Sequence, residues 1–154
     1  MIIIAAVAEN GVIGAGDHMP WDIPEEYEYF LETIRGETVI MGRKSHEIFG
    51  NDLTSRHTIV VSRSEAPAGG ALVVHSLDRA YRVAESLGFE VYCAGGGSIY
   101  RAALDLSNRM LLSEIQGEFP GDVTFPRFSR EDWQEILCEQ HRGYVLHDLH
   151  RIAG

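Results

Sequence analysis

Lysine is almost absent from this sequence, and positive charge of any kind is scarce. The 154 residues contain a single lysine, Lys44, and Lys and Arg together number 13 against 23 Asp and Glu, for a formal net charge of −10. Nucleic-acid binding needs a basic face, so this balance argues against a nucleic-acid partner. It also repels anionic ligands at long range, so a phosphate site must be built from local positive charge. The composition fits adaptation to salt and equally fits codon bias.

Long apolar runs, a signal segment and a disulfide framework are missing too. No run approaches the roughly 20 apolar residues that span a bilayer, which argues against a membrane partner. No basic residue precedes the opening stretch MIIIAAVAENGVIG, which we interpret as a first buried strand and not as a signal peptide. Cys93 and Cys138 are too few for a disulfide framework, so we expect a cytoplasmic protein. Cys93 lies in the apolar run VYCA and is expected to be a buried structural thiol.

The sequence does contain short apolar runs that alternate with amphipathic stretches. Such runs are typical of strands covered on both faces, and the stretches between them of helices. The expected strands are 2–8, 38–41, 58–62, 71–75, 91–95 and 110–115, and the expected helices are 24–35, 44–49, 78–87 and 98–104. This order predicts an α/β fold with a largely parallel sheet in one domain, 1–154. The alternating segments 133–140 and 144–152 predict an antiparallel hairpin at the sheet edge.

The helix expected at 24–35 has clear end signals and one apolar face. Asp22 is expected to cap it, Pro24 suits its first turn, and Gly36 follows its end. Apolar residues recur at the spacing i, i+3, i+4, i+7, which makes one stripe along the helix. The stripe consists of Tyr27, Phe30, Leu31 and Ile34.

Two acids, Glu25 and Glu26, stand side by side in the first turn of this helix. Acids here favour the helix dipole, and for Glu25 this explanation is sufficient. Glu26 lies one turn before Phe30, on the edge of the apolar stripe. Glu26 is therefore a candidate for a carboxylate that faces a pocket, and the helix-dipole interpretation stays open beside it.

Three expected strands end in glycine or positive charge, in TVIMGRKS, TIVVSRS and VYCAGGGSIY. Ligands of parallel sheets bind outside the carboxyl ends of the strands. Arg43 and Arg63 at two of these ends could clamp a phosphate, and the run 95–97 allows close backbone approach to one. The run is not the fingerprint G-x-G-x-x-G, because Tyr100 stands at the last glycine position. Together the three ends indicate a phosphorylated nucleotide such as NADP.

The sequence resembles the dihydrofolate reductase family from Ile2 to about Ile152. The resemblance rests on six segments in the family's order and spacing: IAAVAENGVIG, MPWDIPEE, VIMGRKS, IVVSRS, AGGGSIY and GDVTFP. It implies a mainly parallel eight-stranded sheet with four flanking helices and a C-terminal antiparallel hairpin. It also implies NADPH-dependent reduction of 7,8-dihydrofolate to 5,6,7,8-tetrahydrofolate. We expect a monomer whose partners are these small molecules.

The resemblance implies a catalytic and substrate-binding set. Glu26 matches the active-site acid of W-x-[LI]-P-x-[DE], two residues after the proline, and Trp21 and Ser113 complete the catalytic set, with Ser113 where the family usually has threonine. Arg56 matches the arginine that holds the substrate's glutamate α-carboxylate. The substrate-binding set is Ile4, Ala5, Glu26, Tyr27, Phe30, Phe49, Leu53, Arg56 and Ser113.

The resemblance also implies how NADPH is bound. Segment 13–20 matches a mobile loop that closes over nicotinamide, and the family has a cis bond between the glycines that match Gly95 and Gly96. The implied cofactor-binding set is Ala6, Ile13, Gly14, Met19, Gly42, Arg43, Lys44, Ser45, Ser62, Arg63, His75, Gly95, Gly96, Gly97, Ser98, Ile99 and Tyr100.

Some residues depart from the family pattern, and other functions stay open. Thr54 and Ser55 replace the usual Pro-Gly before the matching arginine, Ala94 replaces a larger aliphatic residue, and Tyr27 stands where a smaller residue is common. One alternative is a reductase of the same fold that acts on another pterin or pyrimidine, of the riboflavin-synthesis type. A second is a catalytically inactive nucleotide-binding paralogue. No metal site is expected: His147 and His150 are three residues apart on a strand and so face opposite sides.

Overall fold

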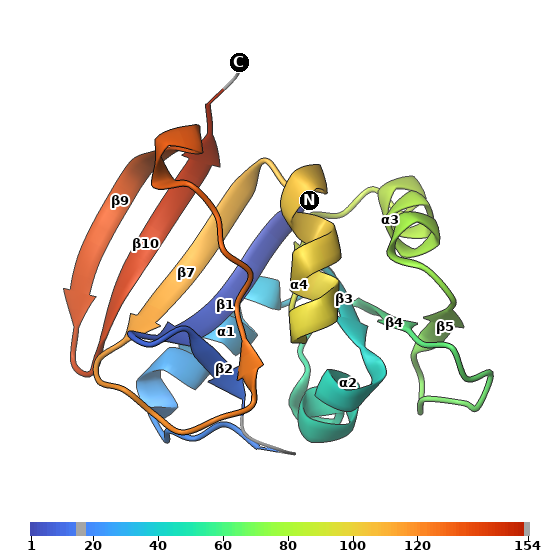
Figure 1. Ribbon diagram of the computed structural model, residues 1–154. Helices are drawn as coiled ribbons and strands as arrows, with labels where there is room; N and C mark the ends of the chain where they lie inside the picture. Colours follow the sequence, from blue (N-terminus) through green and yellow to red (C-terminus); the bar gives the residue numbers. More distant parts are fainter. Residues whose placement is uncertain (15–17, 153–154) are drawn as a thin grey trace.

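The computed structural model describes residues 1–14 and 18–152. Eight strands form one sheet in the order β5-β4-β3-β6-β1-β7-β10-β9 (Figure 1). Their bounds are β1 Ile2–Ala8, β3 Thr38–Gly42, β4 His57–Val61, β5 Leu72–Val74, β6 Val91–Cys93, β7 Arg109–Ile115, β9 Trp133–His141 and β10 Tyr144–Arg151. In this order, every pair of neighbouring strands from β5 through β4, β3, β6 and β1 to β7 is parallel, and β10 runs antiparallel to both β7 and β9. The mainly parallel sheet with an antiparallel hairpin at its edge is confirmed.

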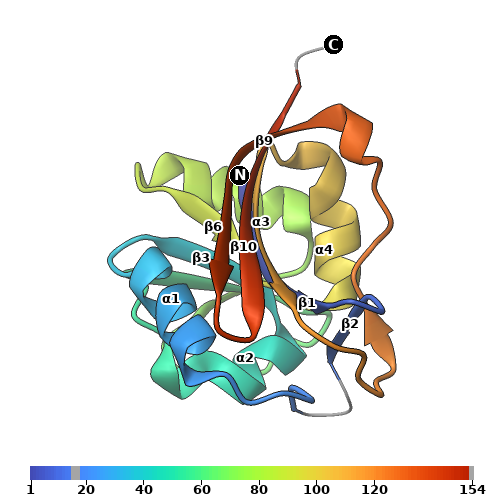
Figure 2. The same ribbon diagram turned by 90° about the vertical axis from the view of Figure 1, so that its left-hand side faces the viewer.

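Helices cover both faces of this sheet. They are α1 Pro24–Ile34, α2 Arg43–Phe49, α3 Leu77–Ser86 and α4 Gly97–Ala103, joined by short 3-10 turns at Gly50–Asp52, Leu104–Leu106 and Arg130–Asp132. Figure 2 shows α1 on one side of the sheet and α4 on the other. Each helix lies within one or two residues of its predicted bounds. No helix within the described ranges is long and apolar enough to cross a bilayer.

The alternation of side chains along β1 divides the interior into two cores. Ile2 and Ile4 pack with Ile34 of α1. Ile3 and Ala5 point the other way, into the core formed with the buried faces of α3 and α4. A strand that is buried on both faces must be apolar at every position, which is why its sequence reads as one continuous run.

The start of α1 differs from the expectation. The residue before the helix is Ile23, which makes no side-chain cap, so the predicted capping role of Asp22 is wrong. The amides of Glu26 and Tyr27 both donate to the Ile23 carbonyl, at 3.1 and 3.2 Å, so main chain closes the first turn. Asp22 lies one residue too early to serve. The other end follows the expectation, because Gly36 has φ +73° just after the helix.

A small second sheet was not predicted. Strand β2 (Val12–Gly14) pairs antiparallel with β8 (Val123–Thr124). Segments of three and two residues are too short to show a periodic pattern. The sheet lies close to α4, since a Cβ on Gly97 would stand 2.9 Å from Cγ1 of Val123. The loop predicted at 13–20 begins here, and its residues 15–17 lie outside the described part of the chain.

Candidate active site

A cavity of about 640 Å³ opens beyond the carboxyl ends of β3, β4 and β6, between α1 and the glycine run. Its size is in the range of small-molecule sites. It brings together predicted residues from distant parts of the chain. Those that line it are Ile4, Ala5, Ala6, Ile13, Gly14, Met19, Trp21, Glu26, Tyr27, Phe30, Gly42, Arg43, Lys44, Ser45, Phe49, Gly95, Gly96, Gly97, Ser98, Ile99 and Tyr100.

Glu26 is the buried acid of this cavity. It is only 9% exposed, whereas its neighbour Glu25 is exposed and forms an ion pair with Nδ1 of His141 at 3.3 Å. Burial raises the pKa of Glu26, and a hydrogen bond with Ser113 of β7 opposes that shift. The two acids therefore differ as the apolar stripe predicts: Glu25 is exposed and forms an ion pair, and Glu26 lies in the cavity wall.

Three aromatic rings form the wall that continues from Glu26. Tyr27 and Phe30 of α1 stack with ring centroids 6.2 Å apart, and Phe49 of α2 lies 6.0 Å from Tyr27 and 6.5 Å from Phe30. The Tyr27 hydroxyl donates to Asp52 at 2.7 Å, which ties α1 to the turn after α2. This wall suits a flat apolar group, and Tyr27 makes it narrower than an aliphatic residue would.

The glycine run forms the opposite wall. The peptide bond Gly95–Gly96 is cis, as the resemblance implies. The Gly42 amide donates to the Gly95 carbonyl at 2.7 Å, which ties the end of β3 to the run. The buried Tyr100 hydroxyl donates to the Ile4 carbonyl at 2.8 Å, so α4 is fixed to β1 within the pocket.

Comparisons with known proteins agree with this geometry. The family model described as "Dihydrofolate reductase" matches residues 1–148. The chain belongs to the dihydrofolate reductase family. A type A13 dihydrofolate reductase from Escherichia coli is 35% identical over 146 residues, which are 94% of this chain and 88% of that protein. A dihydrofolate reductase from Neisseria gonorrhoeae is 40% identical over 142 residues, covering 91% and 87%.

A solved structure in the dihydrofolate reductase family has the same fold. It is the Enterococcus faecalis dihydrofolate reductase complexed with NADP(H) and RAB-propyl, with a TM-score of 0.86 and 26% identity, covering 99% of this chain and 96% of that one. The resemblance seen in the six sequence segments is thus confirmed, and it extends to the three-dimensional arrangement.

The cations predicted for the dihydrofolate reductase cofactor site are not equivalent. Arg43 donates from Nε to Oγ of Ser62 at 2.8 Å, and its other nitrogens donate to carbonyls of the segment 64–67. His75 lies beside them, with Nδ1 2.8 Å from the Ser62 carbonyl. Arg43 thus orders the loop after β4. Lys44 is exposed in the cavity wall, and Arg63 is exposed just after β4, so both side chains reach solvent and can donate to a phosphate.

Several predicted residues lie outside the cavity wall. Ser113 lies behind Glu26, and Leu53 packs on the core next to α1. The Arg56 guanidinium lies over the Phe89 ring, 5.2 Å from its centroid. The others outside the wall are Ser62, Arg63 and His75. Before Arg56, where Thr54 and Ser55 replace the usual Pro-Gly, the Thr54 hydroxyl donates to the Leu31 carbonyl and so anchors this loop to α1.

The cavity also has wall residues that the sequence did not indicate. They are Asp22, Ile23, Pro24, Ile48, Val61, Ala94 and Val123, whereas His18, which also lines the cavity, belongs to the predicted loop 13–20. Ile48 follows Lys44 by four positions on α2, so the helical period could have found it. Val123 comes from the small sheet, and no local pattern places it.

The buried acid is expected to cost stability at neutral pH. The folded pKa of Glu26 is raised above its usual 4.5, so its contribution to stability is present below that value and is lost as pH rises through the folded pKa. Glu26→Gln should therefore raise the free energy of unfolding at about pH 7 by about 0.5–2 kcal/mol. The gain should shrink towards about pH 4, because Glu26 becomes protonated there and is then neutral, as glutamine is. Urea unfolding at both pH values measures it; an equal gain at both would contradict this cause.

Proposed function

We propose that this chain catalyses the NADPH-dependent reduction of 7,8-dihydrofolate to 5,6,7,8-tetrahydrofolate. The observation that carries the proposal is the buried Glu26 carboxylate, set beside an aromatic wall in a cavity that continues to the glycine run. Membership of the dihydrofolate reductase family supports the same activity. Trp21 and Ser113 support Glu26: Trp21 lines the cavity and packs edge-on against Phe119, and Ser113 holds the carboxylate by a hydrogen bond.

Glu26 acts by binding and orienting the pterin. Its two oxygens accept hydrogen bonds from the neighbouring amino group and ring N–H of the pterin, which fixes the ring plane in the cavity. Phe30 and Phe49 contact the aminobenzoyl group and exclude water from that side. When bound, NADPH supplies the hydride that reduces carbon 6 of the pterin. The proton for nitrogen 5 comes through water, and Glu26 sets the local field and the ring tautomer.

The residues of the glycine wall fit a dinucleotide. Gly42 and Gly95–Gly97 line the cavity with main chain, and there is little room for side chains: a Cβ on Gly42 would lie 3.3 Å from Ile99 and one on Gly95 3.1 Å from the Tyr100 ring. Such a wall allows close backbone approach to a pyrophosphate. The family member from Enterococcus faecalis is complexed with NADP(H), which supports the same choice of cofactor.

Purified protein mixed with NADPH and dihydrofolate tests the activity through the loss of NADPH absorbance. Dihydrofolate-dependent turnover supports the proposal. NADPH binding without turnover would contradict it, and assays with other pterins and with riboflavin-pathway pyrimidines would then identify a same-fold reductase. Absence of turnover with every substrate would identify the inactive paralogue.

Removing the pocket's lysine should weaken NADPH specifically. In Lys44→Met the kcat/KM for NADPH should fall about 10- to 100-fold, because a charge-assisted hydrogen bond contributes roughly 1.5–3 kcal/mol. The value for NADH, which lacks the 2′-phosphate, should stay within about twofold. Steady-state kinetics with both cofactors measures the ratio, and Arg79→Met on the exposed side of α3 removes the same charge as a control. Equal losses with both cofactors would contradict a role in binding the 2′-phosphate.

We also propose that residues 1–154 act as one domain and as a monomer in the cytoplasm. Both the first and the last strand lie in the same sheet, and the cavity draws its walls from one chain. The two cysteines are unpaired, with Cys93 buried and its pKa raised by that burial to about 12. Sedimentation of the purified protein tests the monomer.

A further inference from the structure

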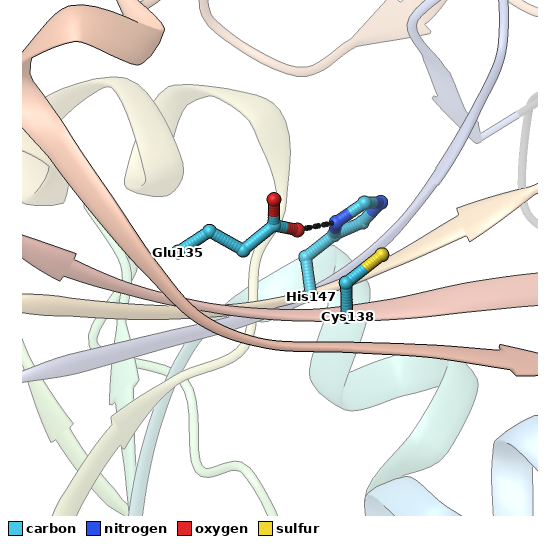
Figure 3. A group of neighbouring side chains, drawn as sticks. All are labelled: Glu135, Cys138 and His147. Carbon is cyan, nitrogen blue, oxygen red and sulfur yellow. Dashed lines mark hydrogen bonds and ion pairs between the residues drawn. The ribbon is translucent and has the colours of Figure 1, made fainter.

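Three side chains that can bind metal ions gather on the hairpin, away from the reductase cavity. Glu135 and Cys138 of β9 and His147 of β10 point toward one another on one face of the sheet (Figure 3). One donor atom from each, namely an oxygen, a sulfur and a ring nitrogen, lies within 4.8 Å of the other two. None of the three lines the cavity.

The strand register explains why these side chains meet. Cys138 is directly opposite His147 in the β9–β10 ladder, so both point to the same face. Glu135 is three residues from Cys138, and on a regular strand it would point the other way. The register shifts between Asp148 and Leu149: Asp148 pairs with Leu137, but Leu149 pairs with Glu135, so the residue of β9 between them has no partner in the ladder. This bulge turns Glu135 onto the face of Cys138 and His147.

His147 is not held as an ordinary core histidine is. It is 9% exposed, and its Nδ1 is hydrogen-bonded to the Glu135 carboxylate. Its Nε2 is buried without a hydrogen-bond partner among the described residues. Buried polar atoms are nearly always paired, so a purely structural role leaves this ring half explained. The contact that the ring does make, through Nδ1, is with Glu135, one of the other two donor groups.

We propose that Glu135, Cys138 and His147 form a binding site for a divalent metal ion of the zinc class. Thiolate, imidazole and carboxylate together are the ligand set of Zn²⁺, whereas Mg²⁺ and Ca²⁺ prefer oxygen alone. Three protein ligands leave a fourth position, which water fills on the exposed side of Glu135 and Cys138. Both of these side chains are on the surface and can turn the short distance that coordination needs.

Binding at this site exchanges protons for metal. Cys138 binds the ion as a thiolate, so its thiol proton passes to the buffer, whereas His147 binds as a neutral imidazole through one ring nitrogen and carries its proton on the other. No electron is transferred. The bound ion links β9 to β10 across the edge of the sheet and so stabilises the hairpin. Ser113, which is hydrogen-bonded to Glu26, pairs with Leu146 and so shares its face of the sheet. His147 follows Leu146 and points to the other face, so the metal site lies on the face opposite to Glu26.

Titration of the full chain, without a histidine tag, with Co²⁺ and then Zn²⁺ tests the site. We expect one Co²⁺ per chain with the charge-transfer absorption of a cobalt–thiolate bond, lost on displacement by Zn²⁺. Cys138→Ser should abolish that absorption and weaken Zn²⁺ binding by at least about 10- to 100-fold, the range seen even for partners outside the ligand set. Cys138 is exposed, so this variant should fold normally.

Matched variants separate the three ligands from their neighbours. Glu135→Gln should weaken Zn²⁺ binding, whereas Glu139→Gln, whose side chain points to the opposite face, should not. Likewise, His147→Gln should weaken Zn²⁺ binding, whereas the control His150→Gln should not. Zn²⁺ should also raise the melting temperature of the wild type but not that of Cys138→Ser. Absence of a thiolate band, or equal losses in the controls and the ligand variants, would overturn the site. Because the readouts are binding and stability, they do not depend on reductase activity.

Discussion

Replacing Glu26 by glutamine is expected to lower kcat for dihydrofolate reduction by about 10²- to 10⁴-fold, because both the orientation of the pterin and the field that favours protonation of nitrogen 5 depend on the carboxylate. The amide has the size of the carboxylate and can still accept from Ser113, so the cavity keeps its shape. However, it presents an NH₂ donor to the two pterin groups that must donate. One of those groups is then left buried without an acceptor, which costs roughly 1–3 kcal/mol before any effect on proton transfer.

Stopped-flow measurement of NADPH oxidation in Glu26→Gln, with NADPH affinity measured separately, tests this expectation. The affinity for NADPH should stay within about twofold, because Glu26 lies on the opposite wall from the glycine run. Glu25→Gln is the matched control, since this exposed acid forms an ion pair with His141 and is not among the described residues that line the cavity. Full activity in Glu26→Gln would mean that another group does this work. Equal losses in both variants would point to a general disturbance of the start of α1.

The two effects of Glu26 have one cause. Burial of the carboxylate makes it a strong acceptor for the pterin, because water does not compete for it. The same burial is expected to destabilise the folded chain at neutral pH, so the glutamine variant should be more stable and far less active. A variant that is both less stable and less active would indicate a structural role for the acid, which the two experiments together distinguish.

Most of the fold could be read from the sequence because the sheet is largely parallel and buried. Each of its central strands is covered on both faces, so each appears as a continuous apolar run between helical patterns. The end of α1 followed from Gly36 in the same local way. Its start did not, since the Ile23 carbonyl closes the first turn in place of the Asp22 side chain. A main-chain group leaves no mark on the sequence, and neither do strands as short as β2 and β8.

The residues of the two sites likewise differ in whether a local sequence pattern or a tertiary contact places them. Glu26 could be found because a helical stripe puts it beside Phe30, and the glycine wall because strand ends meet at one edge of a parallel sheet. The Arg56 guanidinium, which lies over Phe89, depends on tertiary contacts. So does the gathering of Glu135 with Cys138, because spacing alone puts them on opposite faces and only the bulge brings them together.

The second large effect is expected from Gly95→Ala, which should lower the free energy of unfolding by about 2–6 kcal/mol and the affinity for NADPH at least about tenfold. Gly95 has φ +95°, where a side chain costs roughly 1–3 kcal/mol. Its new Cβ would also lie 3.1–3.2 Å from the ring and hydroxyl of Tyr100. That ring cannot move aside freely, because it is buried and its hydroxyl is bonded to the Ile4 carbonyl. Relief must therefore come from the glycine wall itself, at a further cost of about 1–3 kcal/mol.

Gly88→Ala separates these two contributions. Gly88 has φ +81°, but a Cβ there would meet nothing within 4 Å, and it lies outside the cavity. This control should lose only the backbone contribution, about 1–3 kcal/mol, and should bind NADPH normally. Urea unfolding and NADPH fluorescence titration of both variants measure the difference. If the two variants behaved alike, the contact with Tyr100 would carry no energy. A larger loss at Gly95 with weaker NADPH binding would show that close packing against Tyr100, which is bonded to β1, fixes the position of the glycine wall.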